Sequence, residues 1–165
     1  MSDTRRLQVT TPSDLEIAMI RVFDAPRRLV FDAYTKPELL TRWLGVRDGW
    51  SMAVCEVDLK VGGAYRWIWR GEGPEIESSG VYREIVRPER VVNTERFRVG
   101  DQTQPGEALD TLVLTEEKGK TTTTWTMQFA TKADRDMALQ SGMDGGVGES
   151  YDVLDKVLMS MAAPR

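Results

Sequence analysis

The sequence contains no histidine and only one cysteine, Cys55. Without histidine the chain lacks the usual general base, the Ser-His and Cys-His nucleophile pairs and the commonest metal ligand. A single cysteine excludes an intramolecular disulfide and leaves too few ligands for a typical zinc site. We therefore expect no metal, no cofactor and a reducing, cytoplasmic environment.

Long apolar runs and basic clusters are also missing. No segment approaches the roughly 18 apolar residues that cross a membrane, and the polar residues 1–6 lead into no signal-peptide core. The net charge is −4, without a long basic run. Nucleic-acid binders and proteins of anionic membranes usually carry such a run, so we expect neither partner and no membrane insertion.

What is present suffices for one globular domain. The chain has 165 residues, of which 41% are hydrophobic and 29% charged. A chain of this size buries about 70% of its extended surface on folding. Residues 1–14 are polar and predict a flexible N-terminal arm that could pair at a sheet edge, while residues 15–165 predict the domain.

Periodicity predicts one strand, two short helices, six strands and a long helix. Residues 15–23 are β-branched and apolar, and the apolar periods at 29–34 and 37–43 indicate the short helices, the second ending at Gly45. Turn residues then divide six strands, at 50–59, 63–71, 76–86, 90–98, 109–116 and 120–129.

The helical period returns weakly at 132–140 and strongly at 143–161, where six apolar residues form one stripe: Met143, Val147, Tyr151, Leu154, Leu158 and Met161. Strands joined by short links predict an antiparallel sheet, whose inner face must be covered. We therefore predict an α+β fold, in which a long curved antiparallel sheet of about seven strands wraps around the C-terminal helix.

Several motifs resemble a known superfamily. They include Phe23-Asp24-Ala25-Pro26, Asp58-Leu59-Lys60-Val61-Gly62-Gly63 and Pro88-Glu89-Arg90-Val91-Val92. Together they are similar to the START-like (SRPBCC), helix-grip superfamily and, within it, to bacterial proteins like the activator of the Hsp90 ATPase. The resemblance implies a helix-grip fold over Glu16 to Leu158. Because the superfamily includes lipid carriers, hormone receptors, cyclases and co-chaperones, it implies no single activity.

Alternation along two strands predicts an aromatic inner wall. Tyr65, Trp67 and Trp69 share one face of their strand, opposite two arginines. Trp125, Met127 and Phe129 share the inner face of another, and Thr121 and Thr123 continue it toward a turn, where we expect them to be half exposed. A dense core and a ligand wall use the same residue types, so both interpretations stay open.

Three polar residues share the predicted inner face. Asn93 and Glu95 share their face with Val91 and Phe97, opposite Arg96 and Arg98. A buried carboxylate needs a partner, so Glu95 is a ligand anchor or an acid catalyst, or else a bulge or an ion pair accounts for it. Tyr82 is a polar handle or an ordinary core tyrosine, and the nearby mid-strand Gly80 indicates a bulge or a close approach.

The remaining candidates lie on helices. Trp43 ends the second short helix, and Met143, Val147 and Tyr151 belong to the apolar stripe of the last one. The glycine-rich residues 142–148 weaken the start of that helix, by about 1 kcal/mol for each interior glycine. They could form a gate to a pocket, together with residues 132–140, or permit close packing of helix on sheet.

These residues support three functions. The first is a binding or carrier protein for a hydrophobic or aromatic small molecule, the second a chaperone-associated domain, and the third a cyclase-like or dehydratase-like enzyme using Glu95 or Tyr82. A closed core would favour the second, a purely apolar cavity the first, and a cavity with two convergent titratable groups the third. We assign no catalytic residue, and a homodimer or a heat-shock chaperone partner remains open.

Overall fold

The sheet of the computed structural model is one continuous antiparallel surface. Residues 6–47, 49–104 and 106–162 are described here. The strands follow the order β1 (Gln8–Thr10), β2 (Glu16–Phe23), β9 (Lys120–Gln128), β8 (Ala108–Glu117), β6 (Arg90–Val99), β5 (Ile76–Val86), β4 (Ala64–Arg70) and β3 (Ser51–Val57), with β7 (Gln102–Thr103) paired to β6.

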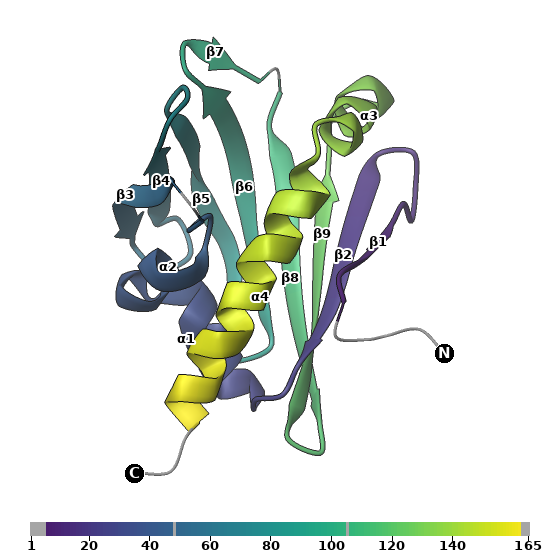
Figure 1. The fold of residues 1–165 in the computed structure, drawn as a ribbon. Helices are drawn as coiled ribbons and strands as arrows, with labels where there is room; N and C mark the ends of the chain where they lie inside the picture. The colour runs from purple at the N-terminus through teal and green to yellow at the C-terminus, as the bar shows by residue number, and fades with distance from the viewer. Residues whose placement is uncertain (1–5, 48, 105, 163–165) are drawn as a thin grey trace.

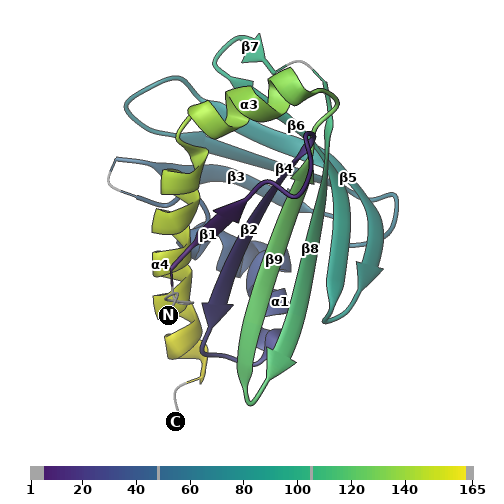
Figure 2. The ribbon, with the colours of Figure 1, turned by 90° about the vertical axis from the view of Figure 1, so that its right-hand side faces the viewer.

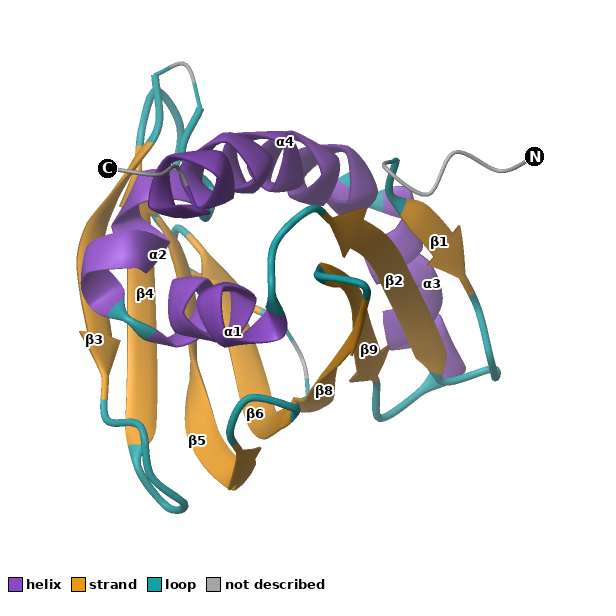
Figure 3. Cartoon of the chain, turned by 90° about the horizontal axis from the view of Figure 1, so that it is seen from below, coloured by secondary structure: helices purple, strands orange, loops and turns teal. Residues whose placement is uncertain are grey.

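Four helices accompany this sheet in the part of the chain that is described. They are α1 (Arg27–Thr35), α2 (Pro37–Trp43), α3 (Lys132–Gln140) and α4 (Met143–Ala162). Figure 1 shows α4 running along the concave face of the sheet, and Figure 3 shows the sheet curving around α4 with α1 and α2 on the same side. The predicted α+β, helix-grip architecture is confirmed.

Two short strands account for the difference from the predicted number. β1 pairs with β2 at one edge of the sheet, as Figure 2 shows, and β7 extends the hairpin after β6. Both are too short to produce an alternating pattern of their own. The pairing of β1 is the edge contact allowed for the first residues, while residues 1–5 lie outside the described chain and the domain boundary at residue 15 stays a prediction.

The core fills the end of the molecule that holds α1 and α2. Tyr151, Leu154 and Leu158 of α4 are at most 2% exposed there and pack with Phe23 and Trp43. Their spacing of three and four residues places them on one face of the helix, as the stripe predicted. The apolar surface that holds α4 on the sheet is therefore concentrated in the second half of the helix.

Polar contacts fix α4 more specifically. The buried Arg21 of β2 pairs with Asp152, at 2.9 Å between Nη1 and Oδ1. Thr121 and Thr123 are fully buried below the helix, so the expected half exposure is wrong. Each hydroxyl donates to a backbone carbonyl, which offsets the cost of burying it.

No helix among residues 6–47, 49–104 and 106–162 is long and apolar enough to cross a membrane.

Candidate functional site

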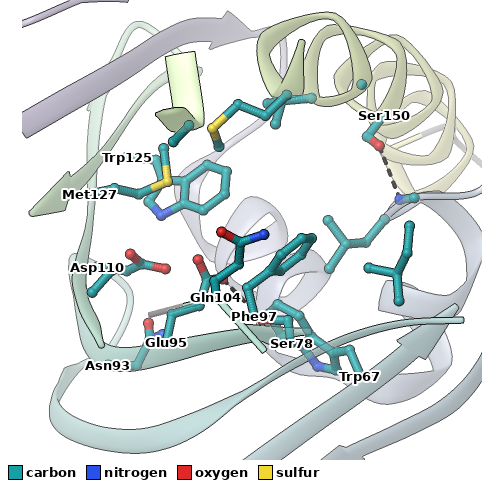
Figure 4. A pocket seen from close by; sticks show the side chains of 18 of the residues that line it. Trp67, Ser78, Asn93, Glu95, Phe97, Gln104, Asp110, Trp125, Met127 and Ser150 are labelled. Carbon is teal, nitrogen blue, oxygen red and sulfur yellow. Dashed lines mark hydrogen bonds between the residues drawn. The ribbon is translucent and has the colours of Figure 1, made fainter. Parts of the chain in front are cut away.

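A cavity of about 410 Å³ separates the first half of α4 from the sheet (Figure 4). The composition of α4 explains its position. Residues 151–158 carry large side chains that reach the sheet, whereas residues 145–148 are Gly-Gly-Val-Gly and fill little space. The curved sheet is thus covered by a helix that does not fill the concavity at one end.

All thirteen residues predicted to bind a ligand line this cavity: Trp43, Tyr65, Trp67, Trp69, Tyr82, Asn93, Glu95, Trp125, Met127, Phe129, Met143, Val147 and Tyr151. The structure thus brings together residues from β4, β5, β6, β9, α2 and α4. Their role in binding stays a prediction.

The aromatic wall comes from β4. Tyr65, Trp67 and Trp69 face the cavity, and their rings follow one another at centroid distances of 4.6 and 6.3 Å. Arg66 and Arg70 lie on the outer face, where they pair with glutamates of β5 and of the preceding turn. The predicted parity of β4 is therefore correct.

Most polar atoms of the wall are already bonded to protein. Trp43 Nε1 donates to the carbonyl of Ala33 at 2.9 Å, and Trp69 Nε1 donates to that of Leu44 at 2.8 Å. Trp67 differs, because its buried Nε1 has no partner within the described chain. Its indole N–H is therefore a donor available at the cavity wall.

Gly80 lets two neighbouring strands approach closely. A Cβ atom here would collide with the backbone oxygen of Thr94, and β5 is bulged two residues further on, between Tyr82 and Glu84. The hydroxyl of Tyr65 uses the same oxygen, donating to it at 2.8 Å. Both features expected of a mid-strand glycine, a bulge and a close approach, are therefore present at the floor of the cavity.

Asn93 and Tyr82 differ in how their polar groups are used. The amide of Asn93 donates to Tyr65 Oη and to the carbonyl of Thr94, both at 3.1 Å, so it supports the floor. Tyr82 is 4% exposed, and in the described residues its hydroxyl makes no side-chain hydrogen bond. Of these two, Tyr82 keeps a free polar group.

Glu95 points inward, as its parity predicts. It is half-buried, and Ser78 Oγ donates to its Oε2 at 3.0 Å. Neither a bulge toward solvent nor an ion pair accounts for it: β6 and β8 pair in continuous register here, and no described cation pairs with its carboxylate. Arg96 and Arg98 bind glutamates elsewhere, at 3.3 and 2.9 Å. The two ordinary explanations for Glu95 are therefore wrong.

A second acid, Asp110 of β8, was not predicted. It is 3% exposed and sits opposite Asn93 in the β6–β8 register, which makes it a diagonal neighbour of Glu95. Figure 4 shows both carboxyl groups in the same part of the cavity, near Trp125. The sequence of β8 contained a clue to this acid, because Asp110 interrupts the apolar face formed by Ala108, Leu112 and Leu114.

The two acids favour retention of a proton. Burial raises the pKa of Asp110 well above its ordinary value, and the charge of Glu95 raises it further, against a lowering by the indole of Trp125. Burial also raises the pKa of Glu95, while hydrogen bonds from Ser78 and Asp110 lower it. Asp110 is thus the group that keeps its proton to the higher pH.

The mouth of the cavity lies between α3, the start of α4 and the loop after β7. Phe97 and Met137 are 36% and 52% exposed there. Arg47 pairs with Glu149 across the rim at 3.8 Å, and Gln104 also lines the cavity. The rim is consequently mixed, with apolar and charged groups beside one another.

Cys55 is not among the residues that line this cavity. Cys55 is half-buried beside the core, and burial followed by the charge of Glu38 raises the pKa of its thiol to about 11, which disfavours the reactive thiolate. The described ranges hold no cluster of three or more histidine, cysteine or acidic residues suited to a metal ion.

Comparison with known proteins agrees with this architecture. The sequence profile of the family described as "Activator of Hsp90 ATPase homolog 1-like protein" matches residues 24–159. The chain belongs to this family. No match is found among curated proteins.

Solved structures of relatives extend the similarity to nearly the whole chain. A crystal structure of a protein from Rhodobacter sphaeroides is 31% identical, with a TM-score of 0.86 over 94% of this chain and 99% of that one. A solution structure from Staphylococcus epidermidis is 25% identical, with a TM-score of 0.78 over 96% and 97%. Protein Ms6760 from Mycobacterium smegmatis, at 19% identity, TM-score 0.81 and coverage of 96% and 100%, shares the fold alone. The residues that match the family, 24–159, thus include those that line the cavity, with Glu95 and Asp110 among them.

Proposed function

We propose that this member of the family binds a hydrophobic or aromatic small molecule between the sheet and α4. The observation that supports the proposal is a preformed cavity of about 410 Å³, a volume typical of small-molecule sites. Trp67, Trp125 and Met127 supply apolar walls, and Glu95 with Asp110 supplies one convergent polar point. Such a combination fixes the orientation of a ligand that is otherwise held by apolar contact.

The neutral fluorescent dye 1-N-phenylnaphthylamine tests this proposal. We expect saturable binding of one dye per chain, with quenching of tryptophan emission. Trp67→Ala removes a wall and should weaken binding about tenfold, as truncation of a central aromatic contact often does. Arg66→Ala, its neighbour on the outer face of β4, is the matched control and should leave binding unchanged. Equal effects of both substitutions, or no saturable binding, would contradict the proposal.

A second candidate function is acid–base catalysis of the cyclase or dehydratase type. The observation that favours it is the pair of convergent carboxyls, because two acids of unequal proton affinity can act as general acid and general base. Tyr82, the other residue considered, could assist through its free hydroxyl. Metabolite extracts incubated with the wild type and with the Glu95→Gln, Asp110→Asn double variant should then differ in a product detected by mass spectrometry. Identical product profiles would leave binding as the better proposal.

The chaperone-associated interpretation rests on the description of the family. An interaction domain without a ligand needs no cavity, and this chain has one, so we place that role third. A chaperone partner and a homodimer both stay predictions. Co-purification of the tagged protein with the Hsp90-type chaperone of its own cell would move this role to first place.

A further inference from the structure

Within residues 6–47, 49–104 and 106–162, neither acid of the cavity has a positively charged partner. Glu95 accepts hydrogen bonds from Ser78 and from Asp110, neither of which brings a positive charge. Asp110 is 3% exposed, yet its Oδ1 is buried without a hydrogen-bond partner. A buried polar atom left without a partner is costly, and it is retained where something else supplies the missing contact.

The groups around the pair offer no compensating charge. Tyr65 of β4, Ser78 of β5, Asn93 of β6 and Trp125 of β9 face the pair. All four are neutral. At the rim, Arg47 is paired with Glu149 and Arg96 with Glu107, and Asp134 adds further negative charge. The charge of ionised Glu95 is therefore not balanced by a described cation inside the cavity.

The aromatic walls of the cavity also favour a positively charged ligand. Trp67, Phe97 and Trp125 line the same cavity as the acids (Figure 4), and the face of an aromatic ring attracts a cation. A protonated amine carries three N–H donors and no acceptor, which matches the carboxylate oxygens of Glu95 and the unpartnered Oδ1 of Asp110. A carboxylate ligand would instead be repelled by the same groups.

From this geometry we infer that the ligand of the cavity is an aromatic or hydrophobic molecule bearing a protonated amine, which lies between Glu95 and Asp110. The inference rests on the proposed binding function and deepens it by naming the chemical class. Fatty acids and other organic anions are excluded as preferred ligands.

Three matched probes test the inference: 2-(1-naphthyl)ethylamine, 2-(1-naphthyl)ethanol and 1-naphthylacetate, titrated at pH 7 by calorimetry. They share the naphthyl ring and carry a cation, a neutral hydroxyl and an anion. We expect the Kd of the amine to be lower than that of the alcohol by about tenfold or more, because one desolvated charge contact can supply such a difference. The acetate should bind most weakly.

Variants locate the effect. The Asp110→Asn, Glu95→Gln double variant keeps the shape of both side chains and should remove the advantage of the amine while retaining the alcohol, whose binding also reports that the cavity is intact. Glu56→Gln removes an exposed acid from the outer face of β3 and should change nothing. If the alcohol or the acetate equals or exceeds the amine in the wild type, the inference is overturned and the binding function stands. If none of the three probes binds, both the inference and the proposed binding function are contradicted.

Discussion

At the scale of single residues, strand parity predicts where a side chain points but not what it meets. Alternation in 90–98 placed Glu95 inside correctly, because one register governs the whole strand. Its neighbour Asp110 comes from another strand. Two residues fifteen positions apart become neighbours only through the β6–β8 pairing, which the alternation of either strand leaves undefined.

The raised pKa of Asp110 predicts a pH-dependent stability. Between the ordinary pKa of an aspartate and the raised folded value, the native state binds more protons than the unfolded state, so the free energy of unfolding decreases as the pH rises through this window. Each unit of difference costs about 1.4 kcal/mol. Asp110→Asn removes this cost, and its amide can still donate to Glu95.

Chemical denaturation at pH 4, 5.5 and 7 measures the effect. The variant should gain stability over the wild type as the pH rises, with the smallest difference at pH 4. Asp101→Asn, an exposed aspartate in the turn before β7, serves as the control and should follow the wild type at all three values. Parallel curves for Asp110→Asn and the wild type would show that Asp110 is ionised in the folded protein at neutral pH.

At the scale of elements, the surroundings of the glycines in α4 distinguish between two interpretations of this segment, close packing and a gate. A Cβ atom at Gly145 would meet nothing within 4 Å, and one at Gly148 would only touch Leu7 at 4.0 Å. Close packing therefore does not require glycine at either position. The gate remains as the interpretation that explains them, although α3 is the firmer half, since buried Arg135 donates to the carbonyl of Ser13 at 2.7 Å.

Gly145→Ala with Gly148→Ala tests the gate. The double variant should stabilise the protein by up to about 2 kcal/mol, because both positions are helical and alanine is the better helix former. Hydrogen exchange at 142–149 should become slower, and so should uptake and release of 1-N-phenylnaphthylamine.

Gly142→Ala is the contrasting control. With φ at +80° this glycine adopts a left-handed conformation, so alanine should destabilise by about 1 kcal/mol. Slow exchange at 142–149 already in the free wild-type protein would contradict the gate.

At the scale of the whole molecule, the sequence was sufficient for the architecture and insufficient for the cavity. Alternating strands and one apolar stripe leave little choice but a sheet wrapped on a helix, since each apolar face needs the other. Whether Trp67 and Trp125 meet side chains or empty space depends on the curvature of the sheet and on how far α4 stands from it. Both properties arise from distant pairings and bulges such as the one after Tyr82.

The central claim is that this space admits a ligand, and the indole N–H signals of the protein test it most directly. In a ¹H–¹⁵N spectrum titrated with 1-N-phenylnaphthylamine, the signals of Trp67 and Trp125 should shift together and saturate at one molecule per chain. Trp67 should respond most strongly, because its Nε1 has no described protein partner. Signals of Trp67 and Trp125 that stay unmoved, while only Trp50 beside Arg47 at the rim responds, would contradict the account.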